Sequence, residues 1–175
     1  KVKLFLVLPF FIGVKMAKEI ERKYLIKDLN ALNLKDRKDF LSIKQCYLKD
    51  NKNFIVRLRL QDSINEHKAF ITIKGKTKGI IRLEYEYEIP YIDALEMIVE
   101  FGEKILSKTR YHIEYNNQKF EVDVFEGQNE GLVIAELELK NQNQIVDLPN
   151  WIGEEISLDK RYFNNNLLKT PFKTW

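Results

Sequence analysis

The sequence predicts an α+β fold that is mainly antiparallel β, in which about eight strands close into a barrel with peripheral helices. Segments of alternating polar and apolar residues recur along most of the chain, as the period of two in a strand requires. Short stretches rich in Asn and Gly separate several of these segments, which favours antiparallel neighbours. Residues 91–102 instead have helical spacing.

Length and composition favour a single domain that can bury a core without disulfides. The chain has 175 residues, of which 45% are hydrophobic and 31% are charged, and its net charge of +3 is too small to indicate nucleic-acid binding. The single cysteine, Cys46, excludes an intramolecular disulfide and favours a cytoplasmic location. Two histidines, His67 and His112, argue against a histidine-based zinc centre.

The N-terminus differs from the rest of the chain. Lys1 and Lys3 precede an apolar run over residues 4–14, which resembles a signal peptide and is too short to span a bilayer. An export signal is one reading of it. Because no Ala-x-Ala site follows and Met16 is a natural start, we expect residues 1–15 to be an extension outside the fold. Residues 16–175 would then form the single domain.

The first half of the chain alternates throughout. The opening strand, residues 19–26, places Glu19, Glu21 and Lys23 on one face and mostly apolar side chains on the other. A polar stretch with one expected helical turn at residues 36–39 follows. Further strands are predicted at residues 42–49, 54–60, 67–74 and 80–89.

The second half begins with the predicted helix. Pro90 ends the preceding strand, apolar residues then recur at helical spacing, and Gly102 is placed as the C-terminal stop. The Asn116-Asn117 pair predicts a hairpin between two of the later strands. These later strands are expected at residues 105–115, 119–125 and 132–140. Residues 148–175 are expected to form short helices and loops that plug or flank one end of the barrel.

Charged residues of the same sign occur two positions apart on one strand after another. The pairs are Glu19/Glu21, Arg57/Arg59, Glu84/Glu86, Lys108/Arg110, Glu121/Asp123 and Glu136/Glu138. Periodicity alone is compatible with two arrangements, in which these charges either meet solvent or line a wet lumen. The pairing favours the lumen, because clustered carboxylates suit Mg²⁺ or Mn²⁺ and clustered Arg and Lys match phosphate oxygens. The opposite charges in such a lumen must neutralise one another.

A series of motifs in order carries a family resemblance. Glu19-Ile20-Glu21-Arg22-Lys23 matches the pattern Glu-x-Glu-x-Lys. The later motifs are Val56-Arg57-Leu58-Arg59, Thr72-Ile73-Lys74-Gly75, Lys108-Thr109-Arg110-Tyr111, Glu121-Val122-Asp123-Val124-Phe125 and the stretches 45–48, 82–90, 131–138 and 159–162. From residue 17 to residue 168 the chain resembles the CYTH superfamily of triphosphate tunnel metalloenzymes, most closely its small bacterial members. Cys46 departs from the pattern, which has a small residue there, and we favour a packed side chain over a reactive thiol.

The resemblance implies an eight-stranded tunnel lined by the charged faces and a site that binds divalent metal and triphosphate. The implied metal ligands are Glu19, Glu21, Glu136 and Glu138. The implied phosphate-binding residues are Lys23, Arg57, Arg59, Lys74, Arg82, Lys108, Arg110 and Arg161. The implied catalytic carboxylates, which would hold a second metal or orient water, are Glu84, Glu86, Glu121 and Asp123. His112 shares the face of Lys108 and Arg110 and is expected to be peripheral.

The function implied by the resemblance is metal-dependent hydrolysis of triphosphates, with Mg²⁺ or Mn²⁺ as cofactor. The favoured reaction converts inorganic tripolyphosphate to diphosphate and phosphate. A class IV-type adenylate cyclase, a nucleoside or thiamine triphosphatase, and a non-catalytic module that binds polyphosphate or nucleotide are the alternatives. The expected partner is a small triphosphate such as tripolyphosphate or ATP, with no nucleic acid and no membrane, and a homodimer is compatible with the sequence.

Overall fold

The computed structural model describes residues 18–175, so the extension predicted for residues 1–15 lies outside the described residues. The strands are β1 (Lys18–Ile26), β2 (Phe40–Asp50), β3 (Ile55–Asp62), β4 (His67–Lys74), β5 (Ile81–Ile89), β6 (Leu106–Tyr115), β7 (Gln118–Phe125), β8 (Val133–Glu138) and β9 (Ile152–Glu155). The helices are α1 (Tyr91–Phe101) and α2 (Asn164–Lys169). Each strand and the helix expected before residue 148 is present. Within residues 18–175, no helix has both the length and the apolar character needed to cross a membrane.

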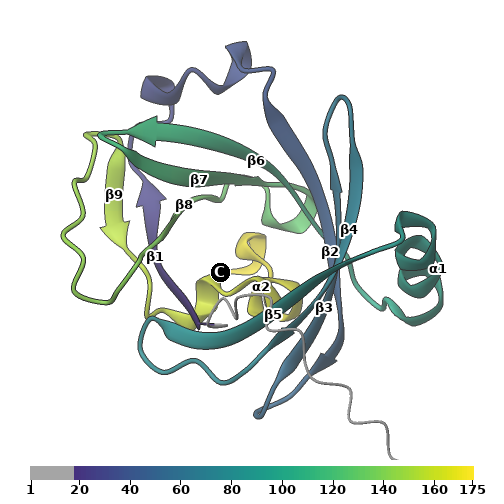
Figure 1. Ribbon diagram of the computed structural model, residues 1–175. Helices are drawn as coiled ribbons and strands as arrows, with labels where there is room; N and C mark the ends of the chain where they lie inside the picture. The colour runs from purple at the N-terminus through teal and green to yellow at the C-terminus, as the bar shows by residue number, and fades with distance from the viewer. Residues whose placement is uncertain (1–17) are drawn as a thin grey trace, which may run out of the picture.

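Strands β1 to β8 form a closed antiparallel barrel, and Figure 1 looks into its interior. Their order around the barrel is β5-β4-β3-β2-β6-β7-β8-β1, and the pairing of β1 with β5 completes the ring. The hairpin between β6 and β7 turns at Asn116 and Asn117, whose φ angles of 47° and 60° suit a tight two-residue turn. The predicted fold class is therefore confirmed.

Two different strands pair with the same edge of β1, one with its first residues and the other with its last. Lys18, Glu19 and Ile20 pair with β5, whereas Tyr24 and Ile26 pair with β9. Between these two ladders, the backbone N–H of Glu21 donates to the carbonyl oxygen of Ile80 (3.3 Å), and the backbone N–H of Lys23 donates to Ser157 Oγ (3.0 Å). The barrel therefore has a seam beside β1 that single hydrogen bonds close.

Two local predictions differ from the structure. The helical turn expected at residues 36–39 is wrong, because the chain forms 3-10 turns earlier, at Asn30–Leu32 and Leu34–Asp36. Leu32 is buried against the barrel, and this packing favours a turn at Leu32 over one at residues 36–39. Strand β9 lies in the stretch expected to contain only helices and loops, since four residues are too few to establish a period.

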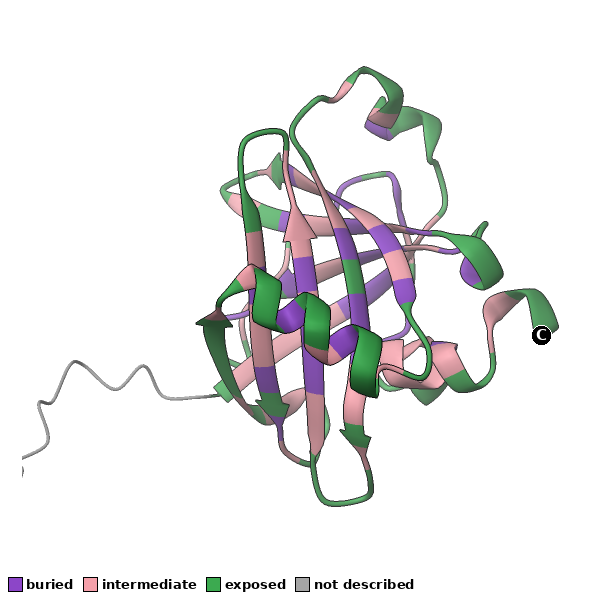
Figure 2. Ribbon diagram, turned by 90° about the vertical axis from the view of Figure 1, so that its right-hand side faces the viewer, coloured by how far each residue is buried: buried purple, intermediate pink, exposed green. Residues whose placement is uncertain are grey.

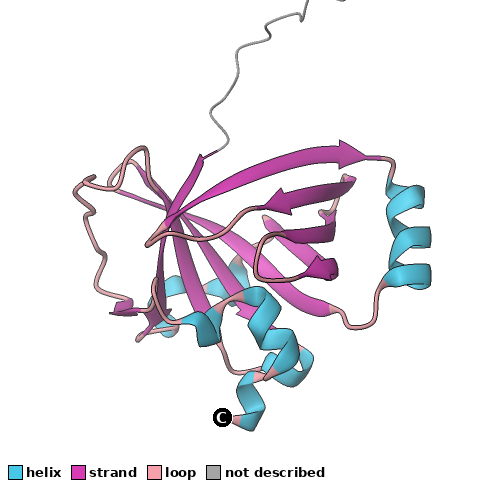
Figure 3. Ribbon diagram, turned by 90° about the horizontal axis from the view of Figure 1, so that it is seen from below, coloured by secondary structure: helices cyan, strands magenta, loops and turns pink. Residues whose placement is uncertain are grey.

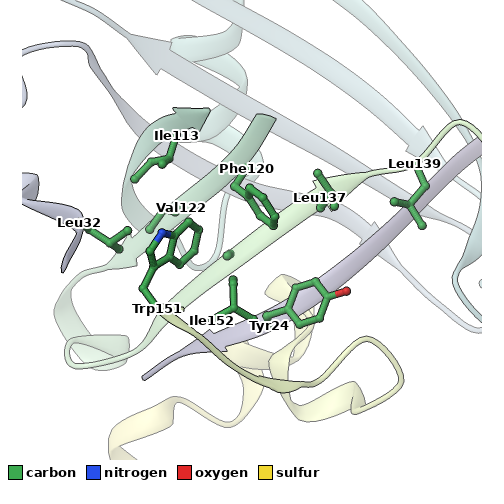
Figure 4. Packing of buried hydrophobic residues seen from close by; sticks show 10 residues of the cluster. Tyr24, Leu32, Ile113, Phe120, Val122, Leu137, Leu139, Trp151 and Ile152 are labelled. Atoms are coloured by element: carbon green, nitrogen blue, oxygen red, sulfur yellow. The ribbon is translucent and has the colours of Figure 1, made fainter. Parts of the chain in front are cut away.

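Apolar side chains cover the outside of the barrel in two places. Helix α1 lies across β3 and β4, where Ala94 and Ile98 pack against Cys46, Leu58 and other outward side chains (Figure 2). The outer faces of β1, β7 and β8 pack against Leu32 of the 3-10 turn Asn30–Leu32 and against Trp151, just before β9 (Figure 4). There the rings of Phe120 and Trp151 meet edge to face at 5.3 Å. The apolar faces of the strands thus point outward over much of the barrel.

The C-terminal segment lies at one end of the barrel, as the views in Figures 1 and 3 agree. Leu167, which is fully buried, joins a cluster with Leu106, Phe125 and Ile134 from the ends of β6, β7 and β8. Asn129 binds the segment twice, because its Oδ1 accepts from the backbone N–H of Phe172 (2.8 Å) and its Nδ2 donates to the carbonyl oxygen of Leu167 (3.3 Å). The segment plugs this end, as the sequence predicts.

Candidate functional site

The charged faces of the strands point into the barrel. A cavity of about 940 Å³, here called the lumen cavity, is bordered by most of the residues predicted for the site. These are Glu19, Glu21, Lys23, Arg57, Arg59, Lys74, Arg82, Glu84, Glu86, Arg110, Glu121, Glu136 and Glu138. Of the two arrangements open to the sequence, the structure has the charged lumen.

Strands β1, β4 and β5 contribute one network of ion pairs. Arg82 binds Glu19 and, at 3.4 Å, Glu21, while Lys74 binds Glu84 and lies 3.6 Å from Glu19. Burial and the nearby Arg57 lower the pKa of Lys74 to about 7, against the influence of its carboxylate neighbours. Burial alone would raise the pKa of Glu84, but Lys74 and Arg57 lower it to about 2. Glu84 is therefore ionised at neutral pH.

Strands β6, β7 and β8 contribute a second, more deeply buried network. Lys108 and Asp123 are fully buried and bind each other, and Arg110 donates to Asp123 Oδ1 (2.6 Å), to Glu136 (2.8 Å) and to Glu121. Burial lowers the pKa of Lys108 to about 8, although Asp123 acts in the opposite direction. Lys108 and Asp123 thus lie behind the surface of the lumen cavity and support Arg110.

Lys23 connects the two networks. Its ammonium group binds Glu136 and lies 3.0 Å from Glu21. Burial would lower the pKa of Lys23, but Glu136 and Glu21 outweigh it and raise the pKa above its ordinary value. Lys23 is therefore a permanent cation between strands β1 and β8.

The two arginines of β3 differ in how far their charges are paired. Arg57 donates to Thr72 Oγ1 (2.9 Å) and to Glu86 (2.7 Å), whereas Arg59 forms no ion pair with any residue from 18 to 175. The Nε atoms of both arginines are buried without a hydrogen-bond partner in this part of the chain. Burial, Arg57 and Arg110 lower the pKa of Arg59 to about 10, which leaves it charged at neutral pH. A buried cation of this kind favours the binding of an anion.

The carboxylates expected to bind metal come from the paired strands β1 and β8. Glu21 lies directly opposite Glu138 in the register, and Lys23 lies opposite Glu136. Glu138 is exposed and forms no ion pair with another described residue, so its oxygens remain available. Across residues 18–175, no three His, Cys, Asp or Glu side chains already converge as a metal site. Glutamate oxygens are nevertheless the donors that Mg²⁺ and Mn²⁺ prefer, and the set fits such an ion.

The comparisons with known proteins agree with this geometry. The CYTH domain family matches residues 17–169. The chain belongs to this family. It is 40% identical over 161 residues to an inorganic triphosphatase of Acetivibrio thermocellus, and the match covers 91% of this chain and 99% of the relative. An inorganic triphosphatase of Nitrosomonas europaea is 35% identical over 153 residues, which cover 85% of this chain and 95% of the relative.

A solved structure shares the fold of this CYTH chain. The crystal structure of an inorganic triphosphatase is 32% identical and superposes with a TM-score of 0.59. The match covers 86% of this chain and 93% of the other chain. The recognition of the family from the sequence motifs is therefore confirmed.

One residue predicted for the CYTH site lies apart from the others. Arg161 is in the 3-10 turn Lys160–Tyr162, where its exposed side chain binds Asp159 (2.6 Å) and lies over the rings of Tyr162 and Trp175. It borders neither the lumen cavity nor a second, smaller cavity beside the C-terminal segment. His112 does not border the lumen cavity and lies 3.5 Å from Glu121, in the peripheral position that we expect. Cys46 is fully buried under α1, where burial raises the pKa of its thiol, so it is the packed side chain that we favour.

Two neutral polar residues of the site, Tyr47 and Thr72, are absent from the residues to which the sequence assigns a role, because that assignment depends on charge. Tyr47 borders a second, smaller cavity and accepts a hydrogen bond from Gln45 Nε2 (3.0 Å), and burial raises its pKa to about 12. Thr72 donates to Glu86 (2.7 Å). The alternation within β2 and β4 places both residues on the lumen face, and this is the signal that could have found them.

Proposed function

We propose that this CYTH protein is a metal-dependent inorganic triphosphatase that hydrolyses tripolyphosphate to diphosphate and phosphate. The supporting observation from the structure is the pair Arg57 and Arg59, whose buried Nε atoms lack partners in the described chain and face a charged lumen. The similarity to two inorganic triphosphatases over most of both chains supports the same activity. The absence of a base-stacking motif from the sequence favours an inorganic substrate over a nucleotide.

Binding of the triphosphate exchanges partners within the lumen. Arg57, Lys74 and Arg82 turn from their carboxylates toward phosphate oxygens, and Arg110 turns from Glu121 and Glu136. Arg59, which has no carboxylate partner in residues 18–175, binds phosphate oxygens directly, with Lys23 beside these groups. An arginine side chain can donate hydrogen bonds to two phosphate oxygens at once, and its charge does not depend on pH near neutrality. Lys108 and Asp123 stay paired and hold Arg110 in place. The same exchange releases the carboxylates of Glu19, Glu21 and Glu136 from their cations.

The released carboxylates, together with Glu138, would hold Mg²⁺ or Mn²⁺. The ion supplies charge neutralisation on the phosphate oxygens and polarises the phosphorus that is attacked. In the hydrolysis, water adds its oxygen to one phosphorus, one bridging P–O bond breaks, and diphosphate leaves with the electron pair of that bond. Glu86 and Glu121 are the most exposed of the four predicted catalytic carboxylates, and we assign them to orienting the water.

The proposal also includes the setting in which the protein works. Residues 16–175 act as one domain, residues 1–15 lie outside it, and a small triphosphate is the partner. A cytoplasmic location agrees with a sequence that contains one cysteine.

Phosphate release from tripolyphosphate, ATP and thiamine triphosphate, measured with Mg²⁺ and with Mn²⁺, tests the proposal. We expect metal-dependent release that is fastest on tripolyphosphate. Glu21→Ala should slow it about a hundredfold, the usual cost of removing one group that stabilises charge in the transition state. Glu96→Ala removes an exposed carboxylate on α1 and serves as the matched control, with release near that of the wild type.

The possible outcomes separate the alternatives. Cyclic AMP formed from ATP would identify a cyclase instead, and tight binding of tripolyphosphate without turnover would identify a binding module. Metal-dependent release that Glu21→Ala leaves unchanged would remove Glu21 from the site and contradict the assignment of the metal ligands.

A further inference from the structure

The lumen communicates with a second, much smaller cavity at the plugged end. This narrow cavity of about 40 Å³ lies between the turn that joins β4 to β5 and the C-terminal segment, where Thr77, Gly79, Ser157 and Phe163 border it. Its volume accommodates water-sized groups only. The space beside the C-terminal segment is therefore much narrower than the lumen cavity.

Asn164, the first residue of α2, borders both cavities. The other residues that border both are charged strand residues of the proposed site: Glu19, Glu21, Lys23, Arg57, Lys74 and Arg82. Asn164 is thus a neutral residue of the C-terminal plug that lies among the groups expected to hold the phosphates.

The side chain of Asn164 forms no hydrogen bond with residues 18–175, in contrast to its two neighbours. Asn165 donates through Nδ2 to Asp50 (3.1 Å), and Asn166 donates through Nδ2 to the carbonyl oxygen of Lys160 (2.8 Å). The buried Leu167, whose backbone N–H donates to the carbonyl oxygen of Phe163 (2.9 Å), fixes the same turn. The neighbours therefore hold the backbone in place while the amide of Asn164 remains available.

We propose that Asn164 determines substrate length by closing the narrow end of the lumen and donating a hydrogen bond to the outermost phosphate of tripolyphosphate. The inference rests on the proposed function and extends it to the choice among inorganic polyphosphates. A carboxamide suits this position because its N–H groups bind phosphate oxygens and it does not form ion pairs with the surrounding glutamates. A fourth phosphate at this end would have to displace Asn164.

Kinetic constants for tripolyphosphate and linear tetrapolyphosphate test the inference on the full chain. Asn164→Asp replaces a donor by a negative charge and should lower kcat/KM for tripolyphosphate about tenfold or more, the effect of losing one hydrogen bond to a charged group. Asn164→Ala opens the end and should raise the rate on tetrapolyphosphate relative to tripolyphosphate severalfold. Asn65→Asp makes the same change in charge in the exposed turn between β3 and β4 and should leave this ratio at the wild-type value.

The rise in unfolding temperature that tripolyphosphate causes provides a second readout without turnover. Asn164→Asp should reduce this rise, and Asn65→Asp should keep it. If Asn164→Asp does not fold, the ratio of rates in Asn164→Ala decides. An unchanged ratio in Asn164→Ala, or equal kcat/KM in the two Asp variants, would overturn the role of Asn164 while the triphosphatase stands. Wild-type protein that fails to cleave tripolyphosphate would instead overturn the proposed function.

Discussion

Asp123 and Glu121 lie on the same face of one strand but have different surroundings in the structure. They lie two residues apart on the lumen face of β7, and the sequence assigns both of them to catalysis. Asp123 is fully buried between Lys108 and Arg110, with both oxygens occupied. The side chain of Glu121 is 37% exposed near the mouth of the lumen. The structure therefore favours a structural role for Asp123.

Asp123→Asn tests this distinction through stability. The change leaves Lys108 and Arg110 buried without their charge partner, which should cost about 3 kcal/mol or more in the free energy of unfolding. For a chain of this size that corresponds to a fall of about 10 °C in the unfolding temperature. Glu121→Gln, the control on the same face, should shift it by about 2 °C or less, since solvent screens its pairs. Equal shifts in the two variants, measured by thermal unfolding, would show that burial does not separate these carboxylates.

Residue type predicted which side chains line the lumen only for residues that lie in strands. Arg57 and Arg59 are two residues apart in β3, so they lie on the same face of the strand, and this face lines the lumen. The ion-pair partners could not be predicted, since they depend on register between strands far apart in sequence. Arg161 and Asn164 lie in the C-terminal segment, where no period applies. The charged Arg161 lies away from the lumen, whereas the neutral Asn164 borders it.

At the scale of elements, helix α1 and the C-terminal segment have separate tasks. Helix α1 packs on the outer faces of β3 and β4, on the side of the wall opposite the lumen. The C-terminal segment contacts the lumen through Asn164. Helix α1 is predicted from the sequence because its apolar residues have helical spacing. Strand β9 is not, because it has only four residues and forms by pairing with β1, which is distant in the sequence.

Helix α1 should therefore contribute to stability without contributing to substrate binding. Ile98 is 7% exposed in the cluster beneath α1, and Ile98→Ala should lower the free energy of unfolding by about 2 to 4 kcal/mol. Val99 is 84% exposed on the same helix, and Val99→Ala should change it by about 0.5 kcal/mol or less. Urea unfolding measures both values. A loss of tripolyphosphate affinity in folded Ile98→Ala would show that α1 influences the lumen after all.

For the whole molecule, the inverted barrel replaces an apolar interior with charges of both signs in about equal number. Burying so many charges is tolerable because most of the predicted site residues that border the lumen cavity have a partner of opposite sign within residues 18–175, Arg59 and Glu138 being the exceptions among them. A bound triphosphate adds negative charge to this balanced set. Its binding should consequently require both the lumen cations and a divalent metal, and it should stabilise the fold.

Adjacent residues of β1 allow a test of this inside-out arrangement. Lys23 faces the lumen, whereas Arg22 faces outward and lies 3.9 Å from Glu155 of β9. With tripolyphosphate and Mg²⁺ at about 100 times the dissociation constant, the wild type should gain about 2.7 kcal/mol, or about 8 °C in unfolding temperature. Lys23→Ala should lose most of this gain, because Glu21 and Glu136 then face the phosphates without their cation. Arg22→Ala removes the same charge from the outer face and should keep the gain. If both variants lose it equally, the effect of Lys23 is one of overall charge, and the lumen is not where the triphosphate binds.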